Sequence, residues 1–148
     1  MMEIAKQSLN GQVAVITGAG RGIGQAVALA YAEAGAAIVC GARTAAEINE
    51  TVRQIEESGG KGVAIPVDVT DPTAVEALFA EAVAHFGGVD IVVINAGVNQ
   101  DRRTVEESIP EDWRMTLEVN LFGAYHCARA ALPHLKARGS GKIIMVGS

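Results

Sequence analysis

The feature of this sequence that most constrains its fold is a regular alternation of short apolar runs with longer helix-like stretches. Five runs have the valine and isoleucine content typical of buried β-strands, and polar or glycine-rich turns separate them from the stretches that follow. Because neighbouring parallel strands need long crossover connections, this alternation predicts an α/β fold with a Rossmann-type, doubly wound parallel sheet in a single domain. The predicted strands are 13–17, 37–41, 63–67, 89–94 and 142–146.

Local signals mark the ends of four predicted helices. The first helix follows a glycine-rich turn and stops at about Ala34, before a glycine that suits the position after a helix. Thr44 and Glu47 have the spacing of a capping box, which predicts the start of a second helix that runs to about Ser58. The remaining helices are predicted from an Asp71 N-cap to about Gly87, and from the end of a polar loop (99–111) to about Arg138.

The position of Pro66 favours one strand order. A proline lacks the N–H that a central strand must donate, so the third strand is expected at an edge of the sheet, as in the order 3-2-1-4-5. Right-handed crossovers then place the first two helices on one face and the last two on the other. Strands 4 and 5 are left without a helix on the first face, and strand 5 has an unpaired edge. We therefore expect the isolated chain to self-associate.

The turn after the first strand has the composition of a phosphate-binding loop. Its glycines are spaced G-x-x-x-G-x-G at positions 18, 22 and 24, between a strand and an alanine-rich helix. Residues without a Cβ let a pyrophosphate approach the N-terminus of a helix, where free N–H groups and the helix dipole favour an anion. The sequence therefore predicts a dinucleotide-binding turn. The residues assigned to it are Thr17, Gly18, Gly20, Arg21, Gly22, Ile23 and Gly24.

Further motifs make this turn resemble the cofactor loop of the short-chain dehydrogenase/reductase family. Asp68 and Val69, after strand 3, match the family's aspartate beside the adenine ring. Asn95-Ala96-Gly97, after strand 4, matches a motif that borders the cofactor cleft, and Asn120 matches the asparagine of the family's catalytic tetrad. Ser148 falls where the family carries its catalytic serine. The resemblance covers the whole chain, in the correct order, and implies an oxidoreductase that interconverts a carbonyl and an alcohol.

Two arginines favour NADP(H) over NAD(H). The residue that closes strand 2 of such a sheet faces the adenosine ribose, where a carboxylate selects NAD and an arginine accepts the 2′-phosphate of NADP. This chain has Arg43 there, and Arg21 in the glycine turn is a second cation that NADP-dependent relatives use in the same way. We therefore predict NADP(H) as the cofactor.

The resemblance also implies a tyrosine as general acid/base and a lysine four residues later. Tyr31 has no lysine at that spacing, and Tyr125 has only Arg129, which is no substitute for lysine. We expect the pair to lie after residue 148, so that this chain is the N-terminal part of a reductase, inactive by itself. The alternative is a non-catalytic dinucleotide-binding or sensor module, and a methyltransferase-type domain is disfavoured by the motif series above.

Composition excludes several other classes. The net charge of −5 argues against nucleic-acid binding, and no apolar run has the length of a membrane span. Cys40 and Cys127 lack the spacing of a metal site and are predicted to be buried free thiols in a reducing compartment. We expect a cytoplasmic protein that acts on a small molecule and binds no metal, and the resemblance implies a homo-oligomeric parent.

Overall fold

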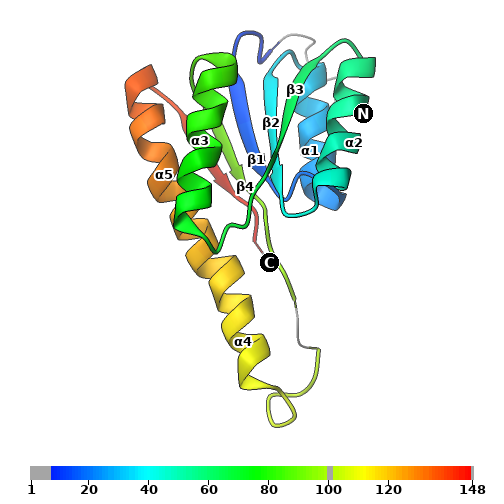
Figure 1. The fold of residues 1–148 in the computed structure, drawn as a ribbon, viewed down its shortest axis with the longest axis vertical. Helices are drawn as coiled ribbons and strands as arrows, with labels where there is room; N and C mark the ends of the chain where they lie inside the picture. Colours follow the sequence, from blue (N-terminus) through cyan, green and yellow to red (C-terminus); the bar gives the residue numbers. More distant parts are fainter. Residues whose placement is uncertain (1–7, 100–101, 148) are drawn as a thin grey trace.

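A computed structural model describes residues 8–99 and 102–147 of the chain, which form a three-layer α/β fold. A five-stranded parallel sheet has the order β3-β2-β1-β4-β5, with helices on both of its faces (Figure 1). The predicted class and strand order are therefore confirmed, and Pro66 ends the edge strand β3. The strands are β1 (Val13–Thr17), β2 (Ala37–Ala42), β3 (Lys61–Pro66), β4 (Ile91–Ile94) and β5 (Lys142–Met145).

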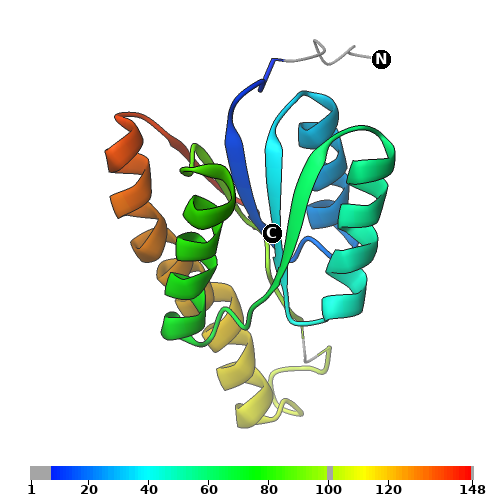
Figure 2. The same cartoon turned by 45° about the horizontal axis from the view of Figure 1, so that its top comes forward.

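The central strand β1 is buried along its whole length because both of its faces are covered. Ala14 and Ile16 pack in one apolar cluster with α1 (Gly22–Glu33) and α2 (Ala45–Glu57). Val15 belongs to a second cluster, on the opposite face, with α3 (Pro72–Phe86) and α5 (Gly123–Arg138). Figure 2 shows the two groups of helices on either side of the sheet, which is the distribution predicted from right-handed crossovers.

The predicted ends of α2 and α3 are confirmed, but the capping box predicted at the start of α2 is not formed. The Asp71 side chain accepts the Thr73 N–H at 2.9 Å at the start of α3, and Gly87, with φ of 84°, ends that helix. Thr44 is the N-cap of α2, but its side chain makes no capping hydrogen bond, so the predicted capping box is absent. The Glu47 side chain lies instead against the backbone of Gly20, in the glycine turn.

The single long helix predicted before strand 5 has an irregular middle. An α-helix, α4 (Pro110–Leu117), is followed by a π-helical turn, η1 (Glu118–Phe122), and then by α5. In Figure 1, α4 lies well beyond the end of the sheet and carries the preceding loop with it. Gly139, with φ of 79°, ends α5 as predicted.

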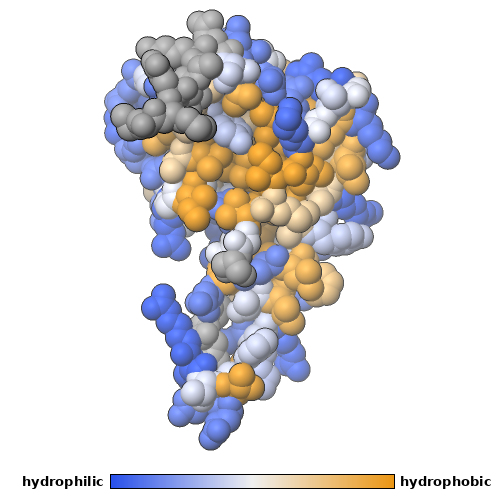
Figure 3. Space-filling view, turned by 180° about the vertical axis from the view of Figure 1, so that it is seen from behind, coloured by the Kyte–Doolittle hydropathy of each residue, from blue (hydrophilic) through white to orange (hydrophobic). Residues whose placement is uncertain are grey.

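One face of β4 and β5 is left partly open, as predicted. Ile144 of β5 is paired in register with Val93 of β4 and lies on the side of the sheet that carries α1 and α2. Val93 is 1% exposed, whereas Ile144 is 39% exposed, because no helix of the described residues covers the end of the sheet there. Figure 3 shows hydrophobic residues gathered on this side of the molecule. Among the helices described, none is long and apolar enough to cross a membrane.

Candidate functional site

A cleft of about 500 Å³ opens at the carboxyl ends of the strands. It lies where the chain direction across the sheet reverses, between β1 and β4, which is the usual place for a ligand in a doubly wound sheet. A larger hollow, of about 1070 Å³, lies at the amino ends of the strands, near Asn10 and Lys61, and contains none of the predicted site residues. The cleft at the carboxyl ends is therefore the candidate site.

Most of the predicted cofactor-binding residues meet in this cleft, although they come from four separate turns. Thr17 and Gly24 are buried and do not line it, and Ser148 lies outside the described residues. The predicted residues that line the cleft are Gly18, Gly20, Arg21, Gly22, Ile23, Arg43, Asp68, Val69, Asn95, Ala96 and Gly97.

The glycine turn has a backbone shape that larger residues would not allow. Gly18 and Gly22 have φ values of 66° and 56°, in the left-handed region. A Cβ on Gly24 would overlap the Gly18 carbonyl oxygen, so this glycine lets α1 pack directly against the turn. The first turn of α1 has no acidic residue and no side-chain cap, which leaves its N–H groups available to an anion. The turn therefore fits a pyrophosphate.

Thr17 and Asn95 join this turn to the end of β4. The Thr17 hydroxyl is fully buried and accepts the backbone N–H groups of Asn95 at 3.0 Å and Ala96 at 3.1 Å. In return, the Asn95 side-chain amide donates to the carbonyl oxygens of Thr17 at 3.1 Å and Gly18 at 3.2 Å. These four bonds hold two walls of the cleft together, and they explain why a polar residue is buried at the end of β1.

Charged groups also line the cleft after β2 and β3, where the sequence predicts the adenosine. Arg43, the residue after β2, is exposed and lines the cleft. Asp68, which comes two residues after β3, brings a carboxylate to the same cleft. The pKa of Asp68 is lowered, chiefly by the hydrogen bond from the Thr70 backbone N–H, while partial burial opposes this shift. The Thr70 hydroxyl and the charge of Arg43 lower this pKa further. The carboxylate is thus ionised and held in place at neutral pH.

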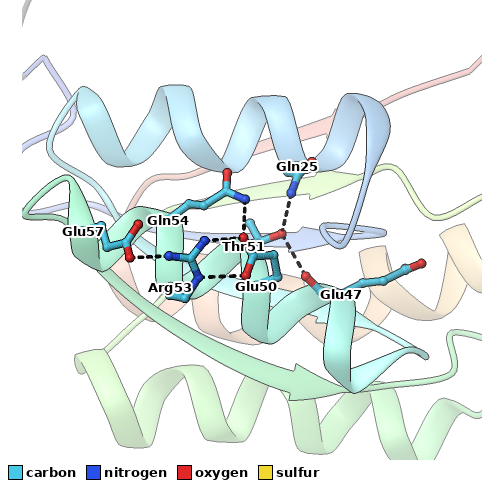
Figure 4. A network of polar contacts seen from close by, with 7 residues as sticks. All are labelled: Gln25, Glu47, Glu50, Thr51, Arg53, Gln54 and Glu57. Atoms are coloured by element: carbon cyan, nitrogen blue, oxygen red, sulfur yellow. Dashed lines mark hydrogen bonds and ion pairs between the residues drawn. The ribbon is translucent and has the colours of Figure 1, made fainter.

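Two residues of the site were not predicted from the sequence. Glu47 lines the cleft with its side chain against Gly20, and Thr51, one turn further along α2, has a fully buried hydroxyl that lies 3.0 Å from the Ala19 carbonyl oxygen. Figure 4 shows Thr51 between α2 and α1. Its sequence signal is weak: it occupies the inward stripe of α2 between Ile48 and Ile55, where a β-branched residue reads as core.

Asn120, the predicted catalytic asparagine, lies in η1 and contacts the loop after β4. Its side-chain oxygen accepts the Val98 N–H at 2.8 Å, and its side-chain nitrogen donates to the Val98 carbonyl at 2.8 Å. The side chain therefore holds the backbone that follows Gly97 at the rim of the cleft. A catalytic role for Asn120 stays a prediction, as does that of Ser148.

Comparison with known proteins agrees with this geometry. Residues 12–148 match the family described as short chain dehydrogenase. The chain is 39% identical over 137 residues to cis-4-hydroxycyclohexanecarboxylate dehydrogenase of Sinomonas cyclohexanicum, which covers 93% of this chain and 55% of that protein. It is 43% identical over 143 residues to versicolorin reductase 1 of Aspergillus parasiticus, covering 95% and 53% respectively.

Solved structures show the same relationship. A 3-ketoacyl-ACP reductase from Sinorhizobium meliloti superposes with a TM-score of 0.89 at 40% identity, covering 92% of this chain and 53% of that one. A short-chain type dehydrogenase/reductase from Mycobacterium marinum gives a TM-score of 0.92 at 35% identity, with coverages of 99% and 60%. The chain thus spans about half the length of the curated relatives it matches. By sequence and by fold, it belongs to the short-chain dehydrogenase family.

Proposed function

We propose that this chain is the cofactor-binding part of an NADP(H)-dependent oxidoreductase that interconverts a carbonyl and an alcohol by hydride transfer. The observation that carries the proposal is the cleft itself, which is lined by the glycine turn at an uncapped helix N-terminus and by Arg43. The relatives are named as reductases and dehydrogenases, which supports the reaction class.

The cofactor preference is argued from the charges around the cleft. Arg21 and Arg43 both line it, and at the end of β2 the described chain has Ala42 and Arg43 rather than a carboxylate. A hydrogen bond to a charged group contributes roughly 1.5–3 kcal/mol, so one arginine–phosphate contact suffices for about a tenfold preference. The ribose 2′-phosphate of NADP supplies the anion that would make this contact.

Glu47 places a negative charge in the same cleft but does not change this preference. Its carboxylate lies in the same cleft, beside Gly20, and repels any phosphate bound at the glycine turn. Because the pyrophosphate is common to both cofactors, we expect Glu47 to weaken NAD and NADP alike. We assign discrimination between the two cofactors to the arginines.

Within this proposal the residues have separate tasks. The bound nicotinamide would supply or accept the hydride. The glycine turn holds the pyrophosphate, Asp68 and Val69 border the adenine, and the Asn95-Ala96-Gly97 segment borders the cleft towards η1. Neither Tyr31 nor Tyr125 lines the cleft, so we expect this chain to bind the dinucleotide without turning over substrate.

The test is a titration of the chain with NADPH and NADH, followed by nucleotide fluorescence. Arg43→Ala should weaken NADPH binding about tenfold and leave NADH binding within twofold. Arg53→Ala is the matched control, because Arg53 pairs with Glu50 and Glu57 on the outer surface of α2. Equal weakening of both nucleotides by Arg43→Ala would refute the NADP preference, and binding of neither nucleotide by the wild type would refute the proposed function.

A further inference from the structure

Thr51 places a hydroxyl group in the apolar interior between α2 and the glycine turn. Its side chain is fully buried, and burying a hydroxyl costs free energy unless it is hydrogen-bonded. Two acceptors lie within reach of this group, the carbonyl oxygens of Ala19 at 3.0 Å and of Glu47 at 3.2 Å. The side-chain amide of Gln25, on the first turn of α1, donates to the same hydroxyl at 3.3 Å (Figure 4).

A hydroxyl has one proton to donate, so the two carbonyls compete for it. The Glu47 carbonyl is inside α2, where it accepts a backbone N–H from the following turn of the helix. The Ala19 carbonyl belongs to the glycine turn, is fully buried and is closer to the hydroxyl. Donation to the Ala19 carbonyl therefore stabilises the fold more than donation to the Glu47 carbonyl, because the Ala19 carbonyl is an acceptor outside any helix.

Ala19 is thus held from both sides by elements outside its own turn. Its N–H donates to the Gly41 carbonyl at the end of β2 at 3.3 Å, and its carbonyl accepts from Thr51 on α2. The carbonyl of Ala19 and the N–H of Gly20 belong to one planar trans peptide, so they point in opposite directions. Holding the carbonyl towards α2 turns the Gly20 N–H away from α2, and Gly20 lines the cleft.

We propose that Thr51 is a positioning residue for the pyrophosphate, acting through the Ala19–Gly20 peptide without touching the cofactor. The inference rests on the dinucleotide binding proposed above. Without the hydroxyl, the peptide is free to rotate and to present its carbonyl oxygen to the anion. Gln25 strengthens the arrangement, because it links the hydroxyl to the helix whose N-terminus completes the same loop.

The test compares Thr51→Val, which keeps the shape of the side chain, with Thr51→Ser, which keeps the hydroxyl. We expect Thr51→Val to weaken NADPH and NADH binding about tenfold and Thr51→Ser to stay within threefold of the wild type. Adenosine 2′-phosphate and adenosine 5′-phosphate lack the pyrophosphate, so binding of whichever one the wild type holds should change less than twofold. Thr116→Val is the matched control, because that threonine also bonds the carbonyl four residues back, in α4.

Unchanged dinucleotide binding in Thr51→Val, or equal losses for dinucleotide and adenosine phosphate, would overturn the proposal while leaving the proposed function intact. A wild type that binds no dinucleotide would instead overturn both. If Thr51→Val does not fold, Gln25→Met decides, since Gln25 is only half-buried. We expect it to weaken dinucleotide binding about threefold with adenosine phosphate binding unchanged, and the absence of that loss would count against the role of Thr51.

Discussion

The two loops that border the cleft are held in different ways. The glycine turn and the first residues after β4 are fixed by two threonines, Thr17 and Thr51, whose hydroxyls are both fully buried. The segment from Val98 onwards is fixed by the exposed pair of Asn120 with Val98, and further along by an ion pair between Arg103 and Asp112 at the surface. In Figure 1 α4 lies beyond the sheet, whereas the glycine turn between β1 and α1 lies against it.

The difference teaches how rigidity is distributed around one site. Hydrogen bonds in a buried, low-dielectric setting are strong and costly to break, whereas exposed ion pairs contribute about 0–1 kcal/mol. The side of the cleft that fits the constant part of a dinucleotide is therefore preorganised. The side towards α4 is held by contacts that water competes for, so it opens at lower free energy.

The largest expected effect concerns the rate at which the two cysteines are alkylated, which measures how often each helical layer opens. Burial raises the pKa of both Cys40 and Cys127 to about 12. At pH 8 the thiolate fraction of a group with this pKa is roughly 10⁻⁴, so alkylation in the folded chain should be about a thousandfold slower than in urea.

The thiols also set a pH dependence. An unfolded thiol ionises near pH 8.5–9 and these folded ones only near 12, so the unfolded chain binds fewer protons in that interval and stability falls as pH rises through it. Cys40 lies in the cluster with α1 and α2, and Cys127 in the cluster with α3 and α5. Cys127 is in α5, which continues from α4 and η1 on the less firmly held side of the cleft. We therefore expect mass spectrometry to find Cys127 alkylated before Cys40, and faster labelling of Cys40 would contradict the comparison.

Gly24→Ala should abolish the difference between the two loops by displacing the rigid one. The new Cβ would overlap the Gly18 carbonyl, which is backbone and has no flexible end to move. We expect a loss of dinucleotide affinity of at least a hundredfold, together with a lower melting temperature. Gly62→Ala is the control, because its Cβ would make ordinary contacts at 3.5 Å, and similar losses in both variants would contradict the argument.

Thr17→Val removes one acceptor from two backbone N–H groups, those of Asn95 and Ala96. A buried donor left without a partner costs about 1–3 kcal/mol, so we expect urea unfolding to give a loss of roughly 2–3 kcal/mol. Thr17→Ser should recover most of it. A loss below about 0.5 kcal/mol in the valine variant would mean that the turn is less firmly held than its burial indicates.

Asn120→Ala has the smallest expected effect, because the bonds it removes are exposed. We expect it to destabilise the chain by about 1 kcal/mol or less, with faster amide exchange confined to the loop around Val98. Asn120→Asp keeps the acceptor and loses the donor, so its free energy of unfolding should lie between those of the alanine variant and the wild type. An effect as large as that of Thr17→Val would remove the contrast between the two loops.

The sequence predicted those parts of the molecule that depend on local pattern. Pro66 favoured the strand order, crossover handedness gave the faces on which the helices lie, and the Asp71 cap followed from the adjacent residues. The capping box of Thr44 and Glu47 was wrong because a contact with Gly20, distant in sequence, places the Glu47 side chain elsewhere. Local spacing carries no information about such a contact.

Other features of the site depend on pairings that a linear pattern does not contain. The π-helical turn at 118–122 sets Asn120 opposite Val98, which is 22 residues away, and nothing in the helix periodicity marks it. Thr51 reads as a core position because a methyl group and a hydroxyl share its side chain. Thr17 was predicted from its motif as a cofactor-binding residue, but its hydroxyl accepts hydrogen bonds from the protein backbone and does not line the cleft.

The open apolar face around Ile144 affects how every one of these quantities is measured. If copies of the chain cover this face for one another, as predicted from the sequence, association buries apolar surface of the folded chain and so stabilises the folded state. The melting temperature and the urea midpoint would then rise with chain concentration. The measured free energy of unfolding would then depend on chain concentration, and variants would be comparable only at matched concentration.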